Sequence, residues 1–130
     1  EENFKFINAY LSRMEPAILE NNGFIDKYIG DAIMALFSGS ADDAVKAGIA
    51  MLQQLKEFNT NRGRLGRPRI KIGIGINTGS MMLGTVGGHS RMDGTAISDA
   101  VNLASRLEGL TKNYGVGLLI SEKTFLALNN

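Results

Sequence analysis

Asp31 is the first residue whose position suggests chemistry. It directly follows Gly30, and the two residues separate "FIDKYI" from "AIMALF", runs that are typical of buried strands. A Gly-Asp pair is common in tight turns between strands. A carboxylate at the rim of a rigid sheet can also bind a divalent cation or lie beside a phosphate. The local sequence alone leaves both interpretations open.

Lys27 lies in the first of these runs, four residues before Asp31. Regular alternation along a strand would place Lys27 on the same face as Ile25 and Ile29, with Tyr28 on the other face. A lysine on an apolar face either extends its ammonium group to the edge of the sheet or hydrogen-bonds a buried polar ligand.

Asn102 and Arg106 form a second candidate pair in a segment with helical periodicity. They are four residues apart and share a polar stripe with Asp99, so we expect them to be neighbours on one helix face. That face is either an ordinary solvated surface or a place where an amide and a guanidinium group meet one ligand.

Other motifs are weaker. His89 is the single histidine, and no cysteine or carboxylate cluster flanks it at ligand spacing, which favours a surface histidine. Gly73, Gly75 and Gly79 do not match the dinucleotide-binding motif, because the third glycine comes one residue late and a strand is expected to follow. The arginine-containing loop "GRLGRPR" lacks aromatic residues and is interpreted as a solvated connector.

Composition narrows the possible partners. The chain has 130 residues, 14 basic and 13 acidic side chains, a formal charge of +1 and no cysteine. This length fits one domain, and the near-neutral balance argues against nucleic acid or an anionic membrane as partner. "AIMALF" is too short to cross a bilayer. Since the sequence opens directly into a helical pattern, we expect a fragment of a longer protein.

The elements that must position these residues follow from periodicity. We expect a helix over 2–21 that Pro16 kinks or divides, strands at 24–29 and 32–37, and a helix over 38–62. A strand at 70–76 would have one apolar face and one bare glycine face, which lets another element come close. We expect a hairpin turn at Gly79 into a strand over 80–88, a loop over 89–96, a helix over 98–110, a strand over 116–121 and a short final helix. This order predicts an α+β sandwich with a largely antiparallel sheet and helices packed on it.

Three segments together resemble a known family. "FIDKYIGDAIMALFSG", "IKIGIGINTGSMMLGTVGG" and "RMDGTAISDAVNLASRLEGLTKNYGVGLLIS" closely resemble the catalytic domain of class III adenylate and guanylate cyclases, with cyanobacterial-type bacterial adenylate cyclases nearest. The resemblance implies a ferredoxin-like, palm-type sandwich. It also implies that residues 1–130 are a core fragment of the catalytic domain. The first strand, with one metal-binding aspartate, and the C-terminal strands, with a triphosphate-binding lysine, are missing from it.

The resemblance implies a role for each candidate. Asp31 matches the second metal-binding aspartate, which with its missing partner would hold two Mg²⁺ or Mn²⁺ ions. Lys27 matches the lysine that reads the purine edge in adenylate cyclases, and Thr95 falls where that reading is completed. Guanylate cyclases typically carry glutamate and cysteine at these two places. Asn102 matches the asparagine that orients the ribose, and Arg106 matches the arginine that steadies the pentavalent phosphorus.

The implied activity is conversion of ATP to 3′,5′-cyclic AMP and pyrophosphate. The implied assembly is a head-to-tail homodimer that takes Asp31 from one chain and Lys27, Asn102 and Arg106 from the other. We expect a cytoplasmic catalytic domain without direct membrane contact, regulatory domains elsewhere in the parent chain, and no activity from the fragment alone. The alternatives are a guanylate cyclase or a non-catalytic cyclase-like module that binds nucleotide or dimerises. The Gly-Gly-Asp/Glu-Glu-Phe signature of diguanylate cyclases does not occur in the sequence.

Overall fold

The computed structural model describes the backbone of residues 2–30, 32–79, 83–86, 89–92 and 94–129. Side chains are described at 8–30, 32–79 and 99–129. The contacts divide the chain into two compact units, Glu1–Ile72 and Gly73–Asn129.

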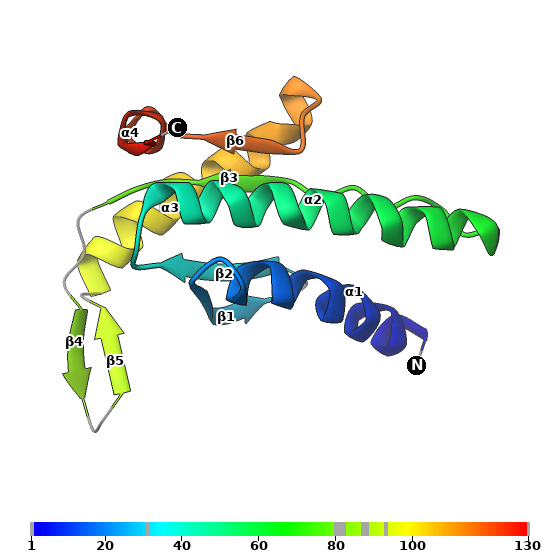
Figure 1. Cartoon of the computed structure of the whole chain (residues 1–130), viewed down its shortest axis with the longest axis horizontal. Helices are drawn as coiled ribbons and strands as arrows, with labels where there is room; N and C mark the ends of the chain where they lie inside the picture. Colours follow the sequence, from blue (N-terminus) through cyan, green and yellow to red (C-terminus); the bar gives the residue numbers. More distant parts are fainter. Residues whose placement is uncertain (1, 31, 80–82, 87–88, 93, 130) are drawn as a thin grey trace. The chain divides into compact units, whose positions relative to one another are not determined.

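The first unit packs two helices on a hairpin. Its elements are α1 (Glu2–Leu19), β1 (Gly23–Ile29), β2 (Ala32–Phe37) and α2 (Ala41–Arg64). β1 and β2 are antiparallel, and both helices pack against the hairpin and against each other (Figure 1). The buried apolar residues come from α1, β2 and α2: Met14, Ala17, Ile18, Met34, Leu36, Ala47 and Leu55. Pro16 lies within α1, which is continuous over its whole length, so this residue does not divide the helix.

Asn59 closes the connection that follows α2. Its Nδ2 donates to the carbonyl oxygen of Ile70 at 2.9 Å, and its Oδ1 accepts from the Ile70 N–H at 2.8 Å. Because both polar atoms of the amide are paired, Asn59 can be buried at little cost. Residues 63–69 of the intervening segment are exposed, as expected of a solvated connector.

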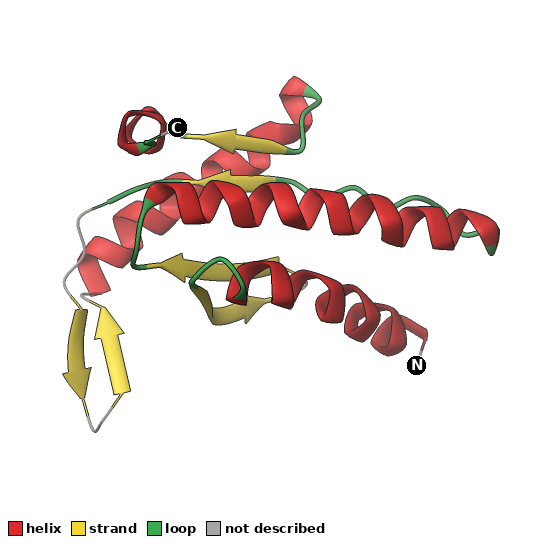
Figure 2. Ribbon diagram, in the orientation of Figure 1, coloured by secondary structure: helices red, strands yellow, loops and turns green. Residues whose placement is uncertain are grey.

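The second unit is built around a parallel strand pair. Its elements are β3 (Ile74–Ile76), β4 (Leu83–Val86), β5 (His89–Met92), α3 (Gly94–Tyr114), β6 (Leu118–Ile120) and α4 (Glu122–Ala127). β3 pairs with β6 in parallel, and β4 pairs with β5 in antiparallel orientation (Figure 2). Parallel strands need a long crossover, and α3, which packs on both β3 and β6, lies within it.

Two expectations about the strands were wrong. The segment over 89–96, expected to be a loop, contains β5. Gly79 does not turn one strand of a hairpin into the next, because within the described residues β3 pairs only with β6 and β4 pairs only with β5. Gly87 and Gly88 separate the paired residues Val86 and His89. A Gly-Gly pair is a strong hairpin signal. The α+β class is confirmed, and two of the three described strand pairs are antiparallel.

Candidate active site

The β1–β2 hairpin has the tight turn that the Gly-Asp pair predicts. Ile29 pairs with Ala32, so Gly30 and Asp31 are the two residues between the strands. Gly30 has φ +61°, and no atom lies within 4 Å of the place where its Cβ would be. Glycine is therefore required here by backbone conformation and not by crowding. Asp31, the expected metal ligand, lies outside the described residues.

Lys27 faces differently from the sequence expectation. The register shifts between Ile25 and Lys27, so that Ile25 pairs with Ala35 while Lys27 pairs with Met34. Neighbouring residues of β2 face opposite sides of the sheet, which puts Ile25 and Lys27 on opposite faces. The expected shared face with Ile25 was wrong because Asp26 forms a β-bulge that reverses the alternation.

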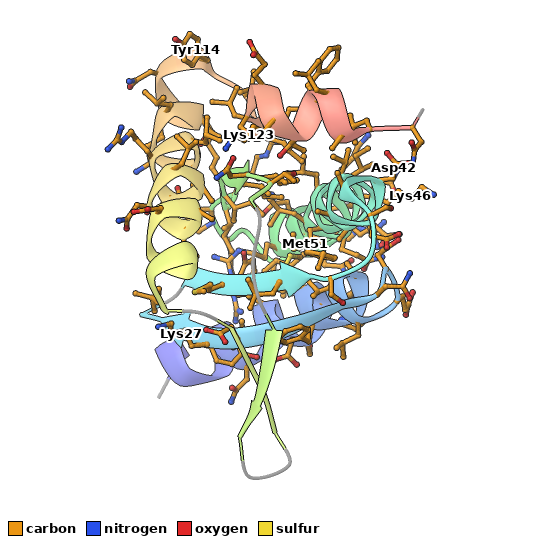
Figure 3. The ribbon with its side chains drawn as sticks, turned by 90° about the vertical axis from the view of Figure 1, so that its left-hand side faces the viewer. Lys27, Asp42, Lys46, Met51, Tyr114 and Lys123 are labelled. Carbon is orange, nitrogen blue, oxygen red and sulfur yellow. The ribbon has the colours of Figure 1, made fainter. Side chains whose placement is uncertain are left out.

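Tyr28, which follows Lys27 on β1, contacts helix α1. The Tyr28 O–H donates to the Glu15 carboxylate on α1, so Tyr28 is turned toward that helix. The hydrogen bond to Glu15, followed by burial and the charge of Glu15, raises the pKa of Tyr28 above its ordinary value of 10.0. Lys27, labelled in Figure 3, pairs across the hairpin with Met34, whose side chain is buried. Although this partner is buried, Lys27 itself is exposed and has no hydrogen bond or ion pair with any described residue.

The bare face of β3 lets α3 approach at backbone distance. A Cβ on Gly75 would collide with the carbonyl oxygen of Ala104 and would lie 2.5 Å from the backbone nitrogen of Glu108. A Cβ on Gly73 would collide with Oγ1 of Thr111 and lie 2.9 Å from the carbonyl oxygen of Glu108. The element expected to come close to the glycine face is thus helix α3.

The exposed side of α3 carries two of the predicted site residues. Asn102 and Arg106 are both exposed and one helical turn apart. Neither makes a hydrogen bond or ion pair among the described residues. Thr95 lies in the first turn of α3, and its side chain is outside the described residues. Exposure is also expected of a plain solvated face, so the roles of Asn102 and Arg106 depend on the family to which the chain belongs.

Sequence reasoning missed Asn77, which follows β3. Its Nδ2 donates to the carbonyl oxygen of Ala100 on α3 at 3.1 Å. Its Oδ1 is buried and has no hydrogen-bond partner among the residues whose side chains the structure describes. The sequence signal was present but unused: a polar amide directly after the alternating run of isoleucines.

The described residues do not complete a metal site. No group of three or more histidine, aspartate or glutamate side chains gathers among them in a way that could hold a cation. Divalent cations in proteins need several oxygen ligands, and Asp31 is one carboxylate. These residues alone therefore do not fit a two-metal centre.

Comparison with known proteins decides the family. The family model of the adenylate and guanylate cyclase catalytic domain matches residues 1–130. The chain belongs to this family. Among the relatives of this cyclase domain is an adenylate cyclase of Anabaena cylindrica, 57% identical over 126 residues, which cover 93% of this chain. The terminal-differentiation-specific adenylate cyclase of Dictyostelium discoideum is 45% identical over 128 residues, or 95% of this chain.

Solved structures agree with this assignment of the fold. The crystal structure of a guanylyl cyclase superimposes with a TM-score of 0.74 at 31% identity, covering 98% of this chain and 66% of that chain. The cyclase domain spans 25% of the length of the Anabaena relative and 6% of the Dictyostelium relative. Within its described residues, no helix combines the length and the apolar character that a membrane span requires.

Proposed function

We propose that the protein containing this domain converts ATP to 3′,5′-cyclic AMP and pyrophosphate. The ribose 3′ oxygen forms a bond to the α-phosphorus and loses its proton, which is carried by pyrophosphate in the overall balance. The bond from that phosphorus to the oxygen bridging to the β-phosphate breaks, and its electron pair leaves with pyrophosphate. The observation that carries the proposal is the 57% identity to a protein named adenylate cyclase.

The proposed preference for adenine over guanine depends on Lys27 and Thr95. A guanylyl cyclase has a similar fold, so the fold alone does not select adenine over guanine. Lys27 and Thr95 occupy the places where guanylate cyclases typically carry glutamate and cysteine. A lysine donates where a glutamate accepts, and a site built to hydrogen-bond one purine edge strongly rejects a mismatched one. The exposed Lys27 ammonium group, unpaired among the described residues, is available for this purpose.

Asn102 and Arg106 are proposed to act on the ribose and the phosphorus. The amide of Asn102 can both donate and accept, which suits a ribose hydroxyl group. The guanidinium of Arg106 suits the charge that develops on phosphate oxygens in the transition state. Both groups extend from a helix whose opposite side is held against Gly75 of β3 and the preceding Gly73 at close distance. Precise positioning of reacting groups requires such a rigid support.

The remaining parts of the proposal concern assembly and cofactors. We place the active site in a head-to-tail homodimer in the cytoplasm, with regulatory domains elsewhere in the parent chain. We propose Mg²⁺ or Mn²⁺ as cofactor and Asp31 as one ligand. The other ligands would come from elsewhere in the parent protein. On this basis residues 1–130 alone should produce no detectable cyclic AMP even at high Mn²⁺.

A nucleotide swap tests the proposal. The parent protein should form cyclic AMP from ATP with Mg²⁺ or Mn²⁺ and lose this activity in chelator. Lys27→Glu combined with Thr95→Cys should shift kcat/KM from ATP toward GTP. Cyclic GMP as the main product of the unmutated protein would identify a guanylate cyclase. Nucleotide binding without turnover in the unmutated protein would instead identify a non-catalytic module.

A further inference from the structure

Asn77 ties the end of β3 to the N-terminal half of α3. Its amide Nδ2 donates to the carbonyl oxygen of Ala100 at 3.1 Å. That oxygen is also the acceptor for the N–H four residues later in a regular α-helix, so the side chain adds a second donor to a carbonyl that helix geometry already pairs. Gly79 lies against the same residue, because a Cβ on Gly79 would be 3.2 Å from the Cβ of Ala100.

The other end of the same amide is unsatisfied. Asn77 Oδ1 is buried and has no hydrogen-bond partner within the described side chains, 8–30, 32–79 and 99–129. A buried acceptor without a donor costs free energy. The fold therefore accepts an unpaired oxygen while it keeps the Nδ2 contact with α3. Local arrangements that lower stability occur preferentially where function requires them.

The hydrogen bond from Asn77 matters because of where Ala100 lies on α3. Further along α3, the contacts with Gly73 and Gly75 involve Ala104, Leu107, Glu108 and Thr111. Ala100 precedes all four, and it is two residues before Asn102. The Asn77 amide thus restrains the part of the helix from which Asn102 extends.

We infer that Asn77 is a positioning residue that acts through Asn102 by holding the Ala100 turn of α3. The inference rests on the proposed function. Asn77 itself is not expected to touch the nucleotide. Its effect is to keep the Asn102 amide where the ribose needs it, and small misplacements of such groups are costly to rate.

Two near-isosteric substitutions in the parent protein separate positioning from stability. Asn77→Asp replaces the donor with an oxygen that repels the Ala100 carbonyl, and Asn77→Leu removes both the donor and the unpaired acceptor. We expect both to lower kcat about tenfold or more, with a smaller change in KM for ATP. Asn77→Leu should nevertheless have a Tm above that of Asn77→Asp. A fully active Asn77→Leu variant would overturn the inference.

A double-mutant cycle with Asn102→Ala tests the route of the effect. If Asn77 acts through Asn102, then Asn77→Leu should change the residual kcat by less than about threefold in the Asn102→Ala background. A tenfold loss in that background would show that Asn77 acts independently of Asn102, and the inference would be wrong.

Amide hydrogen exchange keeps the test independent of the proposed reaction. In Asn77→Leu, the amides of residues 101–106 should exchange faster than in wild type, and those of 108–111 should not change. Unchanged exchange over 101–106 would refute the restraint itself, whatever product the protein makes. Absence of cyclic nucleotide from the wild-type parent, with exchange altered as expected, would refute the proposed function and leave the restraint standing.

Discussion

Replacing Gly75 with alanine tests how α3 is held. The added Cβ would collide with the carbonyl oxygen of Ala104 and lie 2.5 Å from the Glu108 nitrogen and 3.0 Å from the Leu107 Cβ. Two of these three atoms belong to the helix backbone, so no change of rotamer can move them away. β3 and α3 must separate.

The magnitude follows from two opposing terms. Overpacking in a core costs about 1–3 kcal/mol, and rigid backbone neighbours place Gly75→Ala at the upper end of that range. Alanine also restricts the unfolded chain, which returns about 0.4–1 kcal/mol. The net loss of about 2 kcal/mol in the free energy of unfolding should lower Tm by about 8 °C, taking roughly 4 °C per kcal/mol for a domain of this size.

Gly109→Ala is the matched control. Gly109 lies on α3, and no atom comes within 4 Å of the place where its Cβ would be. The same substitution there should stabilise the helix by about 0.5–1 kcal/mol. Thermal unfolding followed by circular dichroism measures both variants. A Gly75→Ala variant as stable as wild type, beside a normally behaving Gly109→Ala variant, would refute the close packing of α3 on β3.

Three further predictions follow from the hairpin and the proposed dimer. Gly30→Ala should destabilise by about 1–2 kcal/mol in urea titrations, because φ +61° is unfavourable for a residue with a Cβ, whereas Gly30→Asn should cost less; equal costs would contradict the backbone explanation. Glu15→Gln should lower the pKa of Tyr28, measured from phenolate absorbance, because the hydrogen bond to Glu15 is the main cause that raises it. Since the folded pKa of Tyr28 is raised, the stability that this pair contributes should be complete below pH 10 and lost as the pH rises through the folded pKa. In the parent protein, Asp31→Ala and Arg106→Ala homodimers should each be nearly inactive, and freely exchanged mixtures should recover roughly a quarter of wild-type activity, because half of the dimers then contain one intact shared site; two inactive variants that exchange but never rescue each other would contradict a shared site.

The sequence correctly predicted those features that depend on a short local pattern of residues. Gly73 and Gly75 predicted a close approach of another element, and in the structure that element is α3. The helical spacing of Asn102 and Arg106 predicted a common face, and both are exposed on α3. The Gly-Asp pair predicted the turn, and Gly30 has the left-handed conformation that such a turn requires.

Pairing between strands was harder to predict. The bulge at Asp26 leaves no mark in the alternation of its own strand, because register is decided by the partner strand. For the same reason the sequence did not show that β3 would pair with β6, more than forty residues later, and not with the strand that follows it. The orientation of Lys27 and the role of Asn77 both depend on such non-local contacts.

The two hydrogen bonds between Asn59 and Ile70 hold together the two ends of the segment that follows α2. Residues 63–69 are exposed, and Gly66 has φ +72° with open space around it. Since the amide fixes both ends of this segment, added length within it changes mainly the loop entropy, which grows only slowly with loop length. The connection after α2 should therefore tolerate inserted sequence, and a fluorescent reporter or a second domain could be joined at Gly66 without displacing Ile70 from Asn59.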